Sequence, residues 1–456
     1  MKLSTTRVLT AAVAVPLALL TTACGGGGGG QQAAAEGAAS MADVKDSDLN
    51  GLKISVGDFF GDCIDEVGTE TDVTKATNEC QAMRILNNKF NAENPYGITV
   101  TREGGAEWKS YYDAVNAAFA AKKPPNVLLM HESNIPDYSS RGLLLPLETG
   151  YKATGIGTSD MTEPAQAAAE IDGTLYAVPI DEHASLSHVN LDLMAKAGLV
   201  KDGKPVLPTS PEELKQQAQK FQQATGKQYI AWGNDFNIPF RIFSSFVAQQ
   251  GDPVVTDKGK VNIDTPAGKA ALGLISDLYS AGIADPQQTY DAAQQAFLNG
   301  DVGILINGTW VVNEYNNTAD FTYLATDFPT VFDQPGVWAN SHTFVIPVQT
   351  DANGPKYRAA MEYAAFMYKN DISWALPTGH LPVRPSVLSS AKYLEAPQRE
   401  NYIDTADNAA LVPQVRGWQG AEDALQHAIE GVWLTGTPVD KALAQAQKDV
   451  EAQLKG

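Results

Sequence analysis

Short apolar runs alternate with amphipathic stretches over residues 51–130. The apolar runs have the length of strands and end near residues 56, 102 and 130. Between them, over 81–91 and 108–122, apolar residues recur every three or four positions, which is the spacing of one helix face. This order of strand, helix, strand, helix and strand is typical of an α/β fold with parallel strands.

The stretch 296–310 (AFLNGDVGILINGTW) organises the rest of the chain. A helix end over 293–298 leads into a turn and then into an apolar run over 302–306, which predicts a buried strand. The pair Asn307-Gly308 turns the chain, and Trp310 follows. Open α/β sheets bind ligands beyond the carboxyl ends of their strands, so Trp310 is predicted to lie at a ligand site. Burial in the core is the alternative, because Trp side chains are often mostly buried.

Local capping signals locate further helices. Ser210 stands before Pro211, and Thr265 stands before Pro266. A Ser or Thr hydroxyl caps the first backbone N–H groups of a helix, and Pro is favoured at the first helical position. These signals predict helices over 211–224 and 265–280. Amphipathic spacing adds helices over 240–250, 355–369, 421–435 and 439–455, and apolar runs add strands over 176–180, 229–232 and 343–346.

The first 23 residues have the pattern of an export signal. Lys2 and Arg7 precede an apolar core over 8–20, which is too short to span a bilayer. Small residues stand directly before Cys24, as in a lipoprotein signal, although Thr21 occupies the position where that signal has Leu. We expect a signal peptide over 1–23 and lipidation of Cys24, with an ordinary secretory signal as the alternative. The Gly- and Ala-rich residues 24–50 are predicted to form a flexible tether.

Composition changes this picture in two ways. About 400 residues follow the tether, which is long for one core and favours two domains. The formal net charge of the chain is −20, and it becomes −22 without Lys2 and Arg7. An acidic surface argues against nucleic acid and against anionic lipid headgroups as ligands. No later run of 18 apolar residues predicts a membrane span.

The remaining cysteines, Cys63 and Cys80, form an even pair in a chain predicted to be exported, so we expect a disulfide between them. Metal binding is the alternative, but no Cys-x-x-Cys motif or clustered His accompanies them. The sequence also lacks G-x-S-x-G, H-E-x-x-H, a Walker A motif and a G-x-G-x-x-G motif after a strand. We therefore expect no catalytic residue, no metal and no cofactor.

Four segments, taken in order and with their spacing, suggest a family. They are DGTLYAVPID (172–181), LPTSPEEL (207–214), the stretch 296–310 and GHLPVRPSV (379–387). With them the chain resembles the family 1 extracellular solute-binding lipoproteins of bacterial ABC sugar importers, the group that includes maltose-binding protein.

The resemblance implies a two-lobed α/β fold of the type II periplasmic-binding-protein kind, with a ligand cleft between the lobes. By analogy, lobe 1 covers 51–165 and 335–374, and lobe 2 covers 166–334 and 375–456. It also implies a monomer without nucleic-acid partners, which is anchored by lipid to the outer face of the cell membrane and delivers its ligand to the permease subunits.

A carbohydrate site needs aromatic platforms for the C–H faces of the sugar and planar polar groups for its hydroxyls. Residues of these types that follow predicted strands or stand in turns are the candidates: Trp108, Glu132, Asp181, His183, Trp232, Trp310, Trp338, His342, Arg384 and Trp418. Each has a structural alternative, which is packing for the Trp side chains, a satisfied buried position for the His side chains, a salt bridge for Arg384, and a capping or solvated role for the carboxylates.

The predicted function is capture of a mono- or oligosaccharide for transport. A polyol, a peptide or another polar solute is the alternative ligand. A secreted glycosidase is a further alternative, in which Glu132 and Asp181 would act as the acid/base pair.

Overall fold

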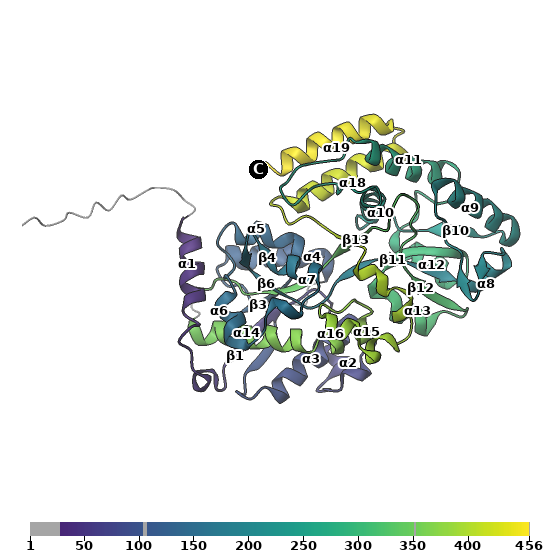
Figure 1. Cartoon of the computed structure of the whole chain (residues 1–456). Coiled ribbons are helices and arrows are strands. Elements are labelled where there is room, and N and C mark those ends of the chain that lie inside the picture. The colour runs from purple at the N-terminus through teal and green to yellow at the C-terminus, as the bar shows by residue number, and fades with distance from the viewer. Residues whose placement is uncertain (1–27, 104–106, 351–352, 456) are drawn as a thin grey trace, which may run out of the picture.

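The computed structural model describes residues 28–103, 107–350 and 353–455, and two mixed sheets form its centre (Figure 1). The first sheet has the strand order β2-β1-β3-β14-β6. Its strands are β1 (Lys53–Gly57), β2 (Thr99–Arg102), β3 (Val127–His131), β6 (Ala177–Pro179) and β14 (His342–Val345). The strands β2, β1 and β3 are parallel, as the sequence predicts, whereas β14 runs antiparallel to both β3 and β6.

The second sheet has the strand order β10-β11-β7-β13-β15, and β12 pairs with β7 in addition. Its strands are β7 (His183–Asn190), β10 (Gln228–Ala231), β11 (Val302–Gly308), β12 (Tyr323–Thr326), β13 (Val337–Asn340) and β15 (Ala409–Leu411). Every residue of β11 is buried, so the strand predicted at 302–306 is confirmed. Both sheets carry antiparallel strands because the chain passes between them more than once.

Helices cover both sheets (Figure 1). The larger helices beside the first sheet are α3 (Glu79–Glu93), α4 (Trp108–Ala120), α6 (Glu148–Thr154), α7 (Glu163–Ala169), α14 (Gly354–Lys369) and α15 (Asp371–Thr378). Those beside the second sheet are α8 (Leu191–Lys196), α9 (Pro211–Thr225), α10 (Ile238–Ala248), α11 (Pro266–Ser280), α12 (Tyr290–Leu298), α13 (Val312–Thr318), α18 (Trp418–Leu434) and α19 (Val439–Gln453).

The capping signals locate their helices correctly. The hydroxyl of Ser210 accepts a hydrogen bond from the backbone N–H of Glu213, and Thr265 caps Gly268 in the same way, both at 3.1 Å. These bonds need only residues three positions apart, which is why sequence alone locates the starts of α9 and α11.

The two cores divide the chain at positions that differ from the predicted lobe boundaries. Strand β6 pairs within the first sheet, and its side chains lie in the first core. Strand β13 pairs with β7, and Trp338 lies in the second core. We therefore propose that the first lobe continues to about residue 180 and resumes at about residue 342, in place of the predicted 165 and 335.

Two crossing segments lie side by side between the sheets. One leads from β6 to β7 and the other from β13 to β14. They run antiparallel, because Asn340 pairs with His183 on one side of the crossing and Thr343 pairs with Pro179 on the other. The next pairing in the first sheet places His342 opposite His131. The register of the crossing therefore gathers histidines that are distant in the sequence.

The predicted flexible tether over 24–50 is wrong for its described part. Residues Gly28–Ala39 form helix α1, which packs against α6 and α14 beside the first sheet (Figure 1). Ala34 and Met41 are buried, and the Gln31 side-chain amide donates a hydrogen bond to the carbonyl of Ser139 at 2.8 Å. Gly30 allows this contact, since a Cβ on it would lie 2.6 Å from the Arg141 carbonyl oxygen. The predicted signal peptide and Cys24 lie outside the described residues.

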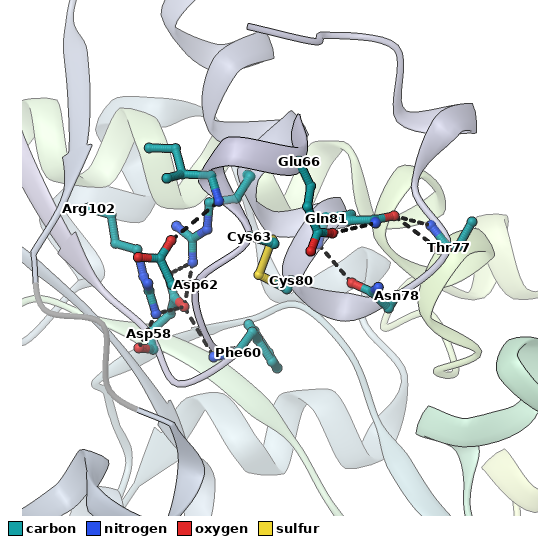
Figure 2. The surroundings of a disulfide bond; sticks show 12 residues. Asp58, Phe60, Asp62, Cys63, Glu66, Thr77, Asn78, Cys80, Gln81 and Arg102 are labelled. Atoms are coloured by element: carbon teal, nitrogen blue, oxygen red, sulfur yellow. Dashed lines mark hydrogen bonds and ion pairs between the residues drawn. A yellow bond between two sulfur atoms is a disulfide. The ribbon is translucent and has the colours of Figure 1, made fainter. Parts of the chain in front are cut away.

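The predicted disulfide is confirmed: Cys63 and Cys80 are joined (Figure 2). The bond ties the loop after β1 to the first turn of α3. Asp58 in the same loop accepts hydrogen bonds from Arg84 at 2.6 Å, and Arg102 lies 3.2 Å from it. Disulfide and ion pairs together hold the segment that carries Phe59 and Phe60.

Among the helices of the described residues, none is long and apolar enough to cross a membrane.

Candidate functional site: an aromatic cleft between the sheets

A cavity of about 1140 Å³ lies between the two lobes. Residues from both sheets line it. Phe59, Phe60, Trp108 and Tyr112 come from the first lobe, and Phe236, Tyr290, Trp310 and Trp338 come from the second. Aromatic side chains therefore face the cavity from both sides, which fits a solute with apolar faces.

Trp310 reaches the cavity in the way the sequence predicts. It follows β11 in the short 3-10 helix Thr309–Val311, and its Nε1 donates a hydrogen bond to the Tyr290 hydroxyl at 2.8 Å. The ring passes over Gly308, where an added Cβ would lie 2.0 Å from a ring carbon. Gly308 is thus required for the position of the Trp310 ring.

Two buried donors at the cavity wall lack a partner. Among the described residues, neither Nε1 of Trp338 nor Nε of Arg241 has a hydrogen-bond acceptor. The Arg241 guanidinium lies 4.2 Å from the centre of a Trp338 ring, so it covers that ring face. An unpaired buried donor costs free energy, about 1–3 kcal/mol, until an acceptor reaches it. Both atoms are themselves buried, so they are not exposed donors of the cavity wall.

Three histidines form the floor of the cavity: His131, His183 and His342. The rings of His183 and His342 are stacked with centres 4.1 Å apart, and His131 lies 4.8 Å from His342. The Asp181 carboxylate binds Nδ1 of His342 at 2.8 Å and Nδ1 of His183 at 3.3 Å. Nδ1 of His131 lies 3.0 Å from the Tyr112 hydroxyl.

A fourth histidine, His380, lies behind this floor. Its Nε2 binds the Glu79 carboxylate at 2.7 Å, and its Nδ1 binds the Thr309 hydroxyl at 2.8 Å. Burial lowers the pKa of His380, but the charges of Asp181 and Glu79 outweigh it and raise the pKa above its ordinary value. The two carboxylates therefore favour the protonated form of His380, which lies between them.

Two histidines of the floor, His183 and His131, have lowered pKa values, in contrast to His380. Burial lowers the pKa of His183 to about 3, and His342 adds to the effect. Burial also lowers the pKa of His131 well below its ordinary value. Burial would raise the pKa of Asp181, but His342 and His380 hold it well below its ordinary value. His131 and His183 are thus neutral rings, and the Asp181 carboxylate near them is ionised.

The structure brings together half of the predicted site residues at this cavity: Trp108, His183, Trp310, Trp338 and His342. Trp108 is the most open of them, with 39% of its surface exposed. Whether each contacts a ligand stays a prediction.

The other five predicted residues lie away from the cavity wall. Asp181 lies beneath the histidines, where Trp374 Nε1 also donates to it at 2.6 Å, and Glu132 is fully buried. Trp232 and Trp418 are buried in the second core, and their Nε1 atoms donate to Tyr279 and Glu422. Arg384 binds Asp160 at 2.8 Å, which is the salt-bridge alternative. Their sequence patterns match those of the cavity residues, and only tertiary packing separates the two groups.

Several cavity residues were missed in the sequence, among them Phe59, Phe60, Tyr112, Arg241 and Tyr290. Phe59 and Phe60 follow β1 as Trp310 follows β11, so the same rule could have found them. Arg241 lies inside helix α10, and no local signal distinguishes it from a solvated charge.

The chain matches the family described as "Bacterial extracellular solute-binding protein" over residues 86–401. The maltotriose-binding protein of Pyrococcus abyssi is 20% identical to it over 83% of this chain and 81% of that protein.

Two solved structures have the same fold. The cyclic alpha-maltosyl-1,6-maltose binding protein from Arthrobacter globiformis has a TM-score of 0.71 at 21% identity, covering 89% of this chain and 99% of that one. UgpB from Mycobacterium tuberculosis, solved in complex with glycerophosphocholine, has a TM-score of 0.73 at 20% identity, covering 88% and 98%. This likeness shows that the two-lobed fold predicted from the sequence is correct.

Proposed function

Since this chain belongs to the bacterial extracellular solute-binding protein family, we propose that it captures a carbohydrate between its two lobes and delivers it to the permease of an ABC transporter. The observation that carries the proposal is the cavity between the lobes, with aromatic rings on both walls and polar side chains such as Asn340 and Gln419 among its lining. Rings stack on the C–H faces of a sugar, and planar polar groups bind its hydroxyls.

The size and charge of the cavity narrow the ligand class. A volume of about 1140 Å³ is at the upper end for small-molecule sites, which favours an oligosaccharide over a monosaccharide. Carboxylates at the cavity, such as Glu79, Asp113 and Asp137, outnumber its three arginines. This excess disfavours an anionic cargo. The names of the maltotriose-binding and cyclic maltosyl-maltose-binding proteins support a glucose-based cargo.

A phosphodiester or another polar solute is the second candidate. Arg141, Arg241 and Arg416 line the cavity, and a protein of the same fold was solved with glycerophosphocholine. The glycosidase alternative loses its acid/base pair, because Glu132 and Asp181 are both fully buried. We therefore propose a binding protein rather than an enzyme, acting as a monomer.

The cargo is tested by thermal unfolding of residues 28–456 with maltooligosaccharides, other sugars, polyols, short peptides and glycerophosphocholine. A ligand at a hundred times its dissociation constant stabilises the fold by roughly 2.7 kcal/mol. We expect a response to an oligosaccharide that Trp108→Ala and Trp310→Ala each weaken by at least tenfold. Trp433→Ala is the matched control, since Trp433 packs on Tyr279 away from the cavity. A response to glycerophosphocholine alone would replace the carbohydrate by the second candidate.

The membrane anchor is a separate part of the proposal. The signal pattern before Cys24 supports export and lipidation at that residue. Growth with a labelled fatty acid should label the full chain, and Cys24→Ser should remove the label and release the protein from the membrane fraction. Release of the unchanged chain would favour an ordinary secretory signal.

A further inference from the structure

We propose that the floor of the cleft binds one divalent transition-metal ion through His131, His183 and His342. One ring nitrogen of each residue lies within 4.8 Å of the corresponding nitrogens of the other two. Nitrogen ligands around a tetrahedral zinc ion lie roughly 3.4 Å apart, so a shift of about an ångström in the rings completes the site. The inference does not rest on the proposed carbohydrate cargo.

The hydrogen bonds of two of the rings, His183 and His342, assign the nitrogen that each can offer. Nδ1 of His183 and Nδ1 of His342 face the Asp181 carboxylate, which only accepts, so both rings donate there and carry a lone pair on Nε2. Nδ1 of His131 lies 3.0 Å from the Tyr112 hydroxyl, which also accepts the backbone N–H of His131, so this contact does not fix the tautomer of the His131 ring. Among the described residues, no hydrogen-bond partner occupies Nε2 of these three rings. Nε2 of His183 and Nε2 of His342 are therefore available for an ion, and His131 adds a third ring nitrogen to the group.

The surroundings match those of a metal site in a second respect. Metal-binding histidines usually donate their other N–H to a carboxylate, a carbonyl or a hydroxyl, which fixes the ring. Asp181 does this for two rings at once and is itself held by Trp374 Nε1 at 2.6 Å. The charge of Asp181 offsets part of the ion's charge, while Arg241 at the cavity acts against it.

The second possible group, Asp181 with His342 and His380, is less suited. Both nitrogens of His380 are engaged, one by Glu79 and the other by Thr309. A metal would have to displace one of these bonds. The triad of His131, His183 and His342 needs no such exchange.

Imidazole ligands select the kind of ion. Three imidazole nitrogens suit zinc, nickel, copper or cobalt, whereas calcium and magnesium prefer oxygen ligands. All three histidines line the cavity, so the remaining coordination position is open to the cleft. An oxygen atom of a bound solute is the natural fourth ligand. The ion would also join the lobes, because His131 and His342 lie on the first sheet and His183 on the second.

The test measures bound ion in the full chain, purified without a polyhistidine tag and stripped with EDTA. After equilibrium dialysis with zinc chloride, we expect one zinc per chain. His183→Gln and His131→Gln should each weaken binding by at least tenfold. His427→Gln is the matched control, because His427 is exposed on α18 outside the cluster, and it should bind like the parent. Circular dichroism checks that each variant is folded.

Visible absorption of bound cobalt reports on coordination directly. A histidine with only a structural role would not change it. The parent should show the intense visible absorption of four-coordinate cobalt, and the two cluster variants should lose it. Asp181→Asn should keep the ligands but weaken binding by about 10–100-fold, as expected of a positioning residue. An EDTA-stripped chain that binds no zinc, or equal binding in His183→Gln and the parent, would overturn the inference. Sugar binding is measured separately in the presence of EDTA. Because EDTA removes the metal, that measurement tests the proposed carbohydrate function alone.

Discussion

At the scale of single residues, the Trp310 ring reaches the cleft because Gly308 has no side chain. A Cβ at Gly308 would lie 2.0 Å from the ring, closer than any real contact. The backbone of Gly308 is extended, with φ −108°, so an L-residue is possible there and only the ring stands in its way.

We predict that Gly308→Ala displaces the Trp310 ring and weakens ligand binding by about tenfold, the range of one aromatic contact. Overpacking should also lower the free energy of unfolding by about 1–3 kcal/mol. Calorimetric titration and thermal unfolding measure the two effects. Gly273→Ala in α11 is the control, since its Cβ meets nothing within 4 Å. Unchanged affinity in Gly308→Ala would show that the ring does not contact the ligand.

His188 makes the stability of the second lobe depend on pH. It is buried between β11 and β12, with Nδ1 2.7 Å from the Tyr323 hydroxyl and Nε2 3.1 Å from the Gly308 carbonyl. Burial lowers its pKa to about 3. In the unfolded chain, His188 becomes protonated below about pH 6.5. In the folded chain, it stays neutral down to about pH 3.

We predict that this histidine alone lowers the free energy of unfolding by about 1.4 kcal/mol for each pH unit below 6.5. In His188→Gln, the loss between pH 6.5 and 4.5 should be smaller than in the parent by roughly 2–3 kcal/mol. Urea unfolding across this range measures it, with the exposed His427→Gln as control. Parallel curves for parent and His188→Gln would contradict the prediction.

The candidate site could be predicted from the sequence only as far as local rules extend. Trp310, His183 and His342 were found because each stands at the end or start of an apolar strand. Trp232 follows β10 in the same way, yet it is buried against Tyr279. The meeting of His131 with His342 depends on strand register across more than 200 residues, and no local pattern carries that information.

At the scale of elements, the disulfide of Cys63 and Cys80 holds one wall of the cleft. Cys80 follows Glu79, the partner of His380, and Cys63 lies three residues after Phe60. The loop between the cysteines has short helical segments, α2 (Ile64–Val67) and the 3-10 turn Val73–Lys75, and contributes little core. The covalent link therefore constrains this wall together with the ion pairs of Asp58.

We predict that the double variant Cys63→Ser/Cys80→Ser loses about 2–4 kcal/mol of unfolding free energy. It should also bind ligand more weakly, because Phe60 and Glu79 are less well held. Urea unfolding and calorimetric titration measure both effects. A reductant should reproduce them in the parent and change nothing in the double variant. Full stability of the double variant would show that the ion pairs of Asp58 hold the loop unaided.

Elements with local signals were predicted well, and those defined by distant partners were not. The caps of α9 and α11 lie within four residues of their targets. By contrast, the glycines of α1 weaken its intrinsic helix propensity although its alanines favour a helix, and packing on α14 and α6 stabilises it. Strand β6 has only three residues, and pairing with β14 decides its sheet.

At the scale of the whole molecule, the two lobes meet along the crossing segments, where Asp181 joins His183, His342 and Trp374. This buried network is a compact point about which the lobes can close. Under the proposed function, ligand binding at both cleft walls favours the closed arrangement.

We predict that the radius of gyration of residues 28–456 decreases when the ligand saturates the cleft. Small-angle X-ray scattering with and without ligand measures the change. Trp310→Ala at the same ligand concentration is the control, and it should scatter like the free protein. An unchanged radius in the saturated parent would indicate a cleft that is already closed without ligand.

Under the proposed lipid anchor, helix α1 limits how far the first lobe can move from the membrane. If lipid is attached to Cys24, the four links from Cys24 to Gly28 span at most about 14 Å. A flexible linker of about 25 residues would have a root-mean-square end-to-end distance of roughly 25–30 Å. Docking of α1 thus reduces the volume that the first lobe can search by about an order of magnitude. A permease in the same membrane would then meet the protein at a correspondingly higher local concentration.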